Sequence, residues 1–140
     1  MEAILARALP ADRVILVMQF LRFGVVGGIG FVVTTAVVYA TRPWIGNYLA
    51  AIPAFLIAAS CNWALNRLWT FRGRGSQPAF REWTMFLATN TLGMVLNAVT
   101  YWAMIALSRF CANHLIIPLV AGTLCGLFAN FTLSRRVVFR

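Results

Sequence analysis

Asparagine and arginine recur at a fixed spacing in two segments of the 140-residue chain. The segment Asn62-Trp-Ala-Leu-Asn-Arg67-Leu-Trp-Thr-Phe-Arg72 is followed 68 residues later by Asn130-Phe-Thr-Leu-Ser-Arg135-Arg-Val-Val-Phe-Arg140, with five of eleven positions identical. In each copy an amide lies inside an apolar stretch, and an arginine follows five residues on, where the stretch meets charge. Self-similarity of this kind predicts a duplicated structure.

These residue types suit a ligand that joins a phosphate to a sugar. A guanidinium is a planar fork that can bind a phosphate through two hydrogen bonds, and an amide can hydrogen-bond sugar hydroxyls. The candidate phosphate-binding residues are the arginines at the ends of apolar runs, Arg22, Arg67 and Arg135. The candidate sugar-binding residues are the asparagines within those runs, Asn62, Asn66, Asn90, Asn97 and Asn130.

Each candidate also has a plainer interpretation. A single asparagine can form an interhelical hydrogen bond worth roughly 0.6–2 kcal/mol, and a single arginine can anchor a helix end by reaching lipid phosphates. The spacing of the asparagines favours a binding site over these plainer interpretations. Asn62 and Asn66 are four residues apart and share a helix face, and Asn90 and Asn97 are two turns apart on one face.

The sequence lacks the residues that proton-coupled transport, catalysis or metal binding would require. The three acids, Glu2, Asp12 and Glu82, lie outside the apolar runs, whereas a proton-coupled transporter normally keeps an ionisable group within the membrane. One histidine and three acids leave no room for a catalytic triad or metal set, and the three cysteines show no metal or disulfide spacing. We therefore expect neither an enzyme nor a cofactor or metal site.

The candidate residues are positioned by four long apolar runs. The chain is 61% hydrophobic and only 11% charged. Charged residues enclose four runs of 19 to 26 uncharged residues, and each suffices for the roughly 20 residues that cross a bilayer. The prediction is an all-α polytopic membrane protein with transmembrane helices near residues 20–40, 48–69, 80–107 and 113–133.

The arginines predict the topology. With four crossings, one side of the membrane carries ten of them, Arg7, Arg13, Arg22, Arg67, Arg72, Arg74, Arg81, Arg135, Arg136 and Arg140. The other side carries only Arg42 and Arg109. Positively charged segments favour the cytoplasm, so both termini should be cytoplasmic. This bias accounts for the net charge of +9 and argues against nucleic-acid binding.

Each predicted hairpin returns to its starting side, so the two copies should be parallel repeats. Their first helices align more weakly, at an offset of 63 that pairs Gly30 with Gly93 and Thr34 with Asn97. The glycine pairs Gly24/Gly28 and Gly122/Gly126 predict close helix packing. Residues 1–19 form a cytoplasmic segment in this prediction, and residues 20–140 form the membrane domain.

The chain resembles the GtrA family of small four-helix membrane proteins over about residues 20–140. The matching segments are Arg22-Phe-Gly-Val-Val-Gly27, Asn62-Trp-Ala-Leu-Asn-Arg-Leu-Trp-Thr-Phe71 and Asn130-Phe-Thr-Leu-Ser-Arg-Arg-Val-Val-Phe139. The resemblance implies that polyprenyl-phosphate-linked sugars are flipped from the inner to the outer leaflet of the cytoplasmic membrane. A partner glycosyltransferase would then use them to decorate O-antigen, teichoic acid or another cell-wall glycan.

Three further expectations accompany this reading. The phosphate would lie at the arginines and the sugar along the asparagines, while the prenyl tail stays among the membrane lipids. Four helices enclose little space, which favours a homodimer with the site at or near its interface. The alternatives are a membrane scaffold that recruits a glycosyltransferase, with Arg72, Arg74 and Arg81 in the docking loop, and a small multidrug-type exporter, which the absence of a membrane-embedded carboxylate disfavours.

Overall fold

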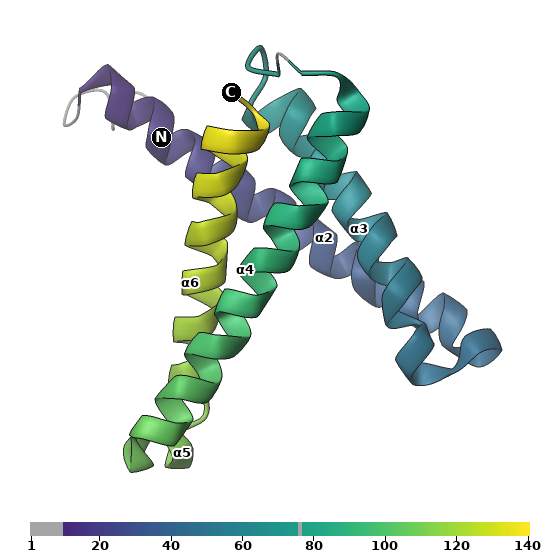
Figure 1. The fold of residues 1–140 in the computed structure, drawn as a ribbon, viewed down its shortest axis with the longest axis vertical. Coiled ribbons are helices and arrows are strands. Elements are labelled where there is room, and N and C mark those ends of the chain that lie inside the picture. Colours follow the sequence, from purple (N-terminus) through teal and green to yellow (C-terminus); the bar gives the residue numbers. More distant parts are fainter. Residues whose placement is uncertain (1–9, 76) are drawn as a thin grey trace. The chain divides into compact units, whose positions relative to one another are not determined.

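The computed structural model describes residues 10–75 and 77–140, which are helical with short connections and contain no strand. The chain divides into two compact units, Met1–Gly75 and Ser76–Arg140. Each unit is a hairpin of two main helices, as Figure 1 shows for α2 with α3 and for α4 with α6. The all-helical fold and the division into two hairpins follow the prediction.

The first unit contains α2 (Ala11–Leu49), α3 (Ala51–Leu65) and a π-helical turn, η1 (Asn66–Thr70). Helix α2 begins directly after Pro10 and passes Pro43, with a kink at Gly46, where φ is +79°. Glycine adopts this left-handed conformation without the steric penalty of other residues. The predicted helix of residues 20–40 is therefore too short at both ends, and residues 11–19, expected as a separate cytoplasmic segment, are part of α2.

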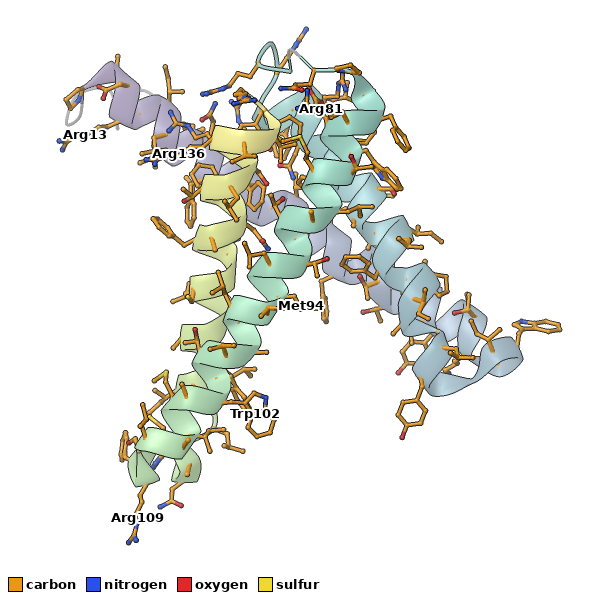
Figure 2. The ribbon with its side chains drawn as sticks, in the orientation of Figure 1. Arg13, Arg81, Met94, Trp102, Arg109 and Arg136 are labelled. Atoms are coloured by element: carbon orange, nitrogen blue, oxygen red, sulfur yellow. The ribbon has the colours of Figure 1, made fainter. Side chains whose placement is uncertain are left out.

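The second unit contains α4 (Ala79–Leu107), the short α5 (Arg109–Asn113), α6 (Ile116–Leu133) and a second π-helical turn, η2 (Ser134–Val138). Helix α4 begins after Pro78, and its extent agrees with the prediction for residues 80–107. Ser108 caps α5 by accepting a hydrogen bond from the backbone N–H of Cys111 at 3.4 Å. Figure 2 shows Arg81 and Arg109 at opposite ends of this hairpin.

The two π-helical turns lie at equivalent positions of the repeat. In η1 the N–H of Phe71 donates to the carbonyl of Asn66 at 2.8 Å, and in η2 the N–H of Phe139 donates to the carbonyl of Ser134 at 2.8 Å. These bonds span five residues instead of four, so each turn is wider than an α-helical turn. The 68-residue repeat of the sequence is thus a repeat of backbone conformation.

Each π-helical turn ends in a phenylalanine that packs on the first helix of its own hairpin. The rings of Phe23 and Phe71 are 6.2 Å apart with an interplanar angle of 59°, and those of Phe86 and Phe139 are 6.1 Å apart at 60°. All four side chains are buried. Tilted aromatic pairs at this distance stabilise a fold beyond their buried area. The offset of 63 between the first helices, weak in the sequence, is confirmed by these matching pairs.

Glycines bring the two helices of each hairpin together, although only some of the predicted ones do so. A Cβ atom at Gly30 would collide with the side chain of Asn62, and one at Gly93 with the side chain of Asn130. At Gly24 and Gly28 a Cβ would meet no atom within 4 Å in the described parts of the chain. The close packing predicted for Gly24 and Gly28 is therefore not made among the residues that the structure describes.

The surfaces of the helices are strongly apolar. Three helical stretches are long and apolar enough to cross a membrane, Ala11–Gly46, Ala79–Leu107 and Ile116–Val138. Large apolar side chains such as Phe31, Trp102 and Phe128 are mostly exposed, and Figure 2 shows Met94 and Trp102 pointing away from the second hairpin. Exposed apolar faces of this extent are typical of surfaces that contact a membrane or another protein. Helix α3 and η1 together carry Asn62, Asn66 and Arg67, which lower the hydropathy of this stretch.

Candidate functional site

The N-terminal part of α2 and the turn η1 line a small, partly open cavity with polar and apolar walls in the first unit. Its volume is about 200 Å³. The cavity is lined on α2 by Val14, Ile15, Met18, Gln19 and Arg22, and at the end of the hairpin by Trp69, Thr70 and Arg72. We call it the first-unit cavity.

The early start of α2 creates one wall of this cavity. Because the helix begins at Ala11, it provides Val14, Ile15 and Met18 as apolar wall residues. The wide turn of η1 brings Trp69 and Thr70 to the opposite wall. Neither element was expected from the sequence, which placed a helix boundary at residue 20 and regular α-helix through residue 69.

Two guanidinium groups and two buried polar side chains line the first-unit cavity. Arg22 is half-buried, and its guanidinium carbon lies 5.9 Å from the ring centroid of Trp69, within cation–π range. Arg72 is exposed. Gln19 and Thr70 are buried, and the Thr70 hydroxyl has no hydrogen-bond partner in the described residues. A buried hydroxyl without a partner costs roughly 1–3 kcal/mol, so a ligand oxygen there would be stabilising.

The predicted arginines differ in their surroundings. Arg22 lines the cavity. The Arg67 guanidinium instead lies 5.7 Å from the ring centroid of Trp63 on the same helical stretch. Arg135 occupies the equivalent position in η2 and is half-buried there. Arg22 and Arg67 thus belong to the first unit and Arg135 to the second.

The predicted asparagines are placed mainly at contacts between the helices of each hairpin. Asn62 lies against Gly30, Asn130 against Gly93, and Asn97 against Gly122 and Gly126. Asn90 donates from Nδ2 to the Phe86 carbonyl of its own helix at 2.9 Å. Asn66 is buried in η1. Helix packing accounts for the position of three of the five amides, and a local hydrogen bond for that of a fourth.

Three of these amides nevertheless keep an oxygen that no described residue satisfies. The side-chain oxygens of Asn62, Asn66 and Asn130 are buried and have no hydrogen-bond partner in the described residues. In an apolar setting such an acceptor is costly. A hydroxyl donor from a ligand would relieve that cost, so the amides retain the capacity to bind a sugar hydroxyl.

Three residues of the cavity were not predicted from the sequence, namely Gln19, Trp69 and Thr70, and Arg72 was expected only in a docking loop. A signal for Gln19 was present: the offset of 63 pairs it with Glu82. Both residues are buried, and Glu82 is fully so, although it lies outside the apolar runs of the sequence. Comparing the two repeats position by position could have identified this buried polar pair.

These features define a small helical membrane protein built from two similar hairpins with arginine-bearing ends. A family model described as GtrA/DPMS, transmembrane domain, matches residues 22–139. The match covers most of the chain, so the protein belongs to this family, as its resemblance to GtrA proteins predicted. No curated protein matches the chain. Membership connects the protein with lipid-linked sugar metabolism.

Proposed function

We propose that this protein carries a polyprenyl-phosphate-linked sugar from the inner to the outer leaflet of the cytoplasmic membrane. The sugar would then be used there for cell-surface or cell-wall glycans. The protein makes and breaks no covalent bond in this proposal. The phosphate is bound at the arginine-bearing end of a hairpin, the sugar passes the asparagines, and the prenyl chain stays among the membrane lipids.

The observation that carries this proposal is the first-unit cavity. It combines cationic, hydrogen-bonding and apolar walls, as a phosphate attached to a lipid requires. It lies where α2 and η1 meet, next to a connector that contains Arg72 and Arg74. Family membership independently favours a lipid-linked sugar over other phosphorylated amphiphiles.

The proposal includes a topology with four membrane crossings and cytoplasmic termini. Helix α3 with η1 would provide the fourth crossing, because Ala51 to Thr70 reaches the roughly 20 residues required. The amides in this stretch are then tolerated because they lie against the partner helix instead of lipid. The excess of arginine at one end of the hairpins favours the cytoplasm for that end.

A second candidate function is recruitment of a glycosyltransferase to the membrane. It is favoured by the connector between the units, in which Arg72 and Arg81 are exposed and Arg74 is half-buried. An arginine-rich loop could dock an acidic surface of a partner. In this case the chain would position an enzyme at its lipid-linked substrate and need not move the lipid itself.

Transport in a purified system separates the two functions. Purified protein would be reconstituted into liposomes with a fluorescent short-chain polyprenyl-phosphate sugar, and a membrane-impermeant quencher would be added outside. We expect the protected inner-leaflet fluorescence to become accessible in proteoliposomes but not in protein-free liposomes. Persistence of the protected pool, together with retention of an added glycosyltransferase on the proteoliposomes but not on protein-free liposomes, would support recruitment instead.

A further inference from the structure

The two hairpins share a common frame. Both contain the tilted phenylalanine pair, the glycine–asparagine contact and the π-helical turn. Features that occur in both copies are explained by the fold itself. Residues that differ between the copies, at positions where the frame is the same, are therefore the better indicators of a specific function.

The residues that line the first-unit cavity differ in this way. At the offsets of 63 and 68, three of its five polar or aromatic lining residues have apolar counterparts in the second unit: Arg22 corresponds to Met85, Trp69 to Val137 and Thr70 to Val138. The other two keep polar counterparts, since Gln19 corresponds to Glu82 and Arg72 to Arg140. Val138 is fully buried in η2 and Thr70 is buried in η1. The same backbone thus accepts apolar side chains at these positions, so the fold does not require the polar ones.

We infer that the first-unit cavity is a binding site for the phosphate head of a polyprenyl-phosphate lipid, and that the second hairpin has no equivalent site. This inference rests on the proposed function. Arg22 and Arg72 supply charged donors for phosphate oxygens. Gln19 and Thr70 supply hydrogen bonds, and the apolar residues of α2 contact the first carbons of the lipid chain.

The size of the cavity limits what enters it. Its volume of about 200 Å³ is below the roughly 300–1,000 Å³ of pockets that enclose a drug-sized ligand. It therefore holds the phosphate and the atoms next to it, while the sugar and most of the chain lie outside. Arg72 is exposed and precedes the turn at Gly73, so the phosphate can bind without first crossing the bilayer. The cavity would therefore bind the lipid phosphate before the lipid is moved across the membrane.

Arg67 receives a different assignment. Its counterpart Arg135 occupies the same position of the other π-helical turn. Arg67 also lies over Trp63, outside the cavity lining, so it is assigned to the shared frame. Arg72 has an arginine counterpart too, Arg140, but it lines the cavity. The asymmetry between the hairpins thus selects Arg22 from the three arginines that the sequence had proposed.

The second hairpin supplies the substitutions that test this site. Arg22→Met and Thr70→Val give the first unit the residues that the same frame already holds in the second. The matched controls are Arg136→Met and Thr84→Val, which alter exposed residues outside the cavity. Each purified variant should elute in size-exclusion chromatography and melt like the wild type.

The probe is a short-chain polyprenyl phosphate without sugar, titrated into the detergent-solubilised full chain by calorimetry. Loss of a hydrogen bond from a charged group should raise Kd by about tenfold to a hundredfold in Arg22→Met, and loss of a neutral one by about two- to tenfold in Thr70→Val. The controls should bind like the wild type. Wild-type affinity in both Arg22→Met and Thr70→Val would overturn the inference.

Competition identifies the source of the phosphate. Inorganic phosphate should compete weakly because it lacks the chain that the apolar wall contacts, and phosphatidylglycerol micelles should compete less well than polyprenyl phosphate. Equal competition by either would overturn assignment to a polyprenyl phosphate. Should Arg22→Met fail to fold, Thr70→Val alone decides the outcome, because it removes a hydroxyl and keeps the side-chain shape.

The liposome assay keeps this inference separate from the proposed function. If Arg22→Met and Thr70→Val both transport and bind like the wild type, the cavity is not the binding site, but the proposed transport function stands. Binding that depends on Arg22 and Thr70, in a protein that moves no lipid in liposomes, would support the site and reject transport. Loss of both binding and transport in Arg22→Met, with normal controls, is the result that we expect.

Discussion

Substitution of Gly93 by alanine is expected to destabilise the second hairpin through a collision with a single side chain. An ideal Cβ at Gly93 would overlap the carboxamide of Asn130, whose Nδ2 would be 2.6 Å away and whose Cγ and Oδ1 would be closer still. Real Cβ contacts are essentially never shorter than 3.0 Å. The three nearest atoms all belong to Asn130, so this side chain, or the helix that carries it, must move.

Two opposing effects set the magnitude. Overpacking of a well-packed contact typically costs about 1–3 kcal/mol, whereas replacing a helical glycine by alanine gains up to about 1 kcal/mol of helix propensity. Gly27→Ala isolates the second effect, because a Cβ there would meet no atom within 4 Å in the described residues. We expect the free energy of unfolding of Gly93→Ala to lie about 1–3 kcal/mol below that of Gly27→Ala.

Truncation of the partner should relieve the collision. Asn130→Ala removes all three of the atoms that the new methyl group would meet. Gly93→Ala combined with Asn130→Ala should therefore be more stable than the sum of the single effects predicts, with a coupling energy of about 1–3 kcal/mol. A double-mutant cycle measures this coupling directly.

Gly126 provides a contrasting case. A Cβ there would be 2.8 Å from the backbone oxygen of Gly93 and 3.1 Å from Cβ of Asn97. Asn97→Ala removes neither atom, so it should not rescue Gly126→Ala. Only truncation of a colliding side chain can restore stability, whereas a collision with backbone requires the helices to separate.

Unfolding in mixed detergent–SDS micelles, followed by circular dichroism, gives the free energies for these variants. Equal stability of Gly93→Ala and Gly27→Ala would refute the collision. Simple additivity of Gly93→Ala and Asn130→Ala would show that the methyl group is accommodated elsewhere, and rescue of Gly126→Ala by Asn97→Ala would contradict the distinction between side-chain and backbone contacts.

The remaining predictions concern topology and ligand binding. In a background with the native cysteines replaced by serine, an impermeant thiol reagent applied to intact cells should label Asn113→Cys but not Gln77→Cys, and the reverse pattern would invert the proposed topology. Asn62→Ala should cost the fold only about 0.5–2 kcal/mol but reduce transport more than the amount of folded protein; equal losses would assign this amide to packing alone. Arg67→Lys and Arg135→Lys should each transport like the wild type, because lysine replaces arginine as a topological charge, and a marked loss in either would show that a bidentate phosphate contact is needed there.

The sequence was sufficient to predict the repeat and the helical membrane class because both depend on residue type and spacing. The repeated block from Asn62 and Asn130 onward corresponds to the equivalent ends of α3 with η1 and α6 with η2. Buried polar side chains mark these same ends. The extent of α4 was also predicted well, because the helix begins directly after Pro78 and its apolar run ends at Arg109.

Other features were not predictable because hydropathy does not report backbone geometry. A charge at Arg22 ends an apolar run but does not end a helix, so α2 continues back to Ala11. The π-helical turns depend on one extra residue per hydrogen-bonded turn, which leaves no mark in composition. The first-unit cavity was not predicted because it forms only where the early start of α2 and the π-helical turn η1 occur together.

The packing of the asparagines shows how differences between the repeats can be interpreted. Asn97 in α4 lies against Gly122 and Gly126, and at the equivalent positions the first unit has Thr34, Ala54 and Ala58. The longer amide side chain of Asn97 is thus accommodated by glycines on the facing helix, where the first unit has alanines.

The differences at the first-unit cavity are of another kind. Replacing Met85 and Val138 of the second unit by their counterparts Arg22 and Thr70 adds a charge and a hydroxyl. The charge lines an open cavity, and the hydroxyl has no hydrogen-bond partner in the described residues. The buried Thr70 hydroxyl costs stability while it lacks a partner. A ligand that satisfies them explains why one hairpin carries these groups while its duplicate folds without them.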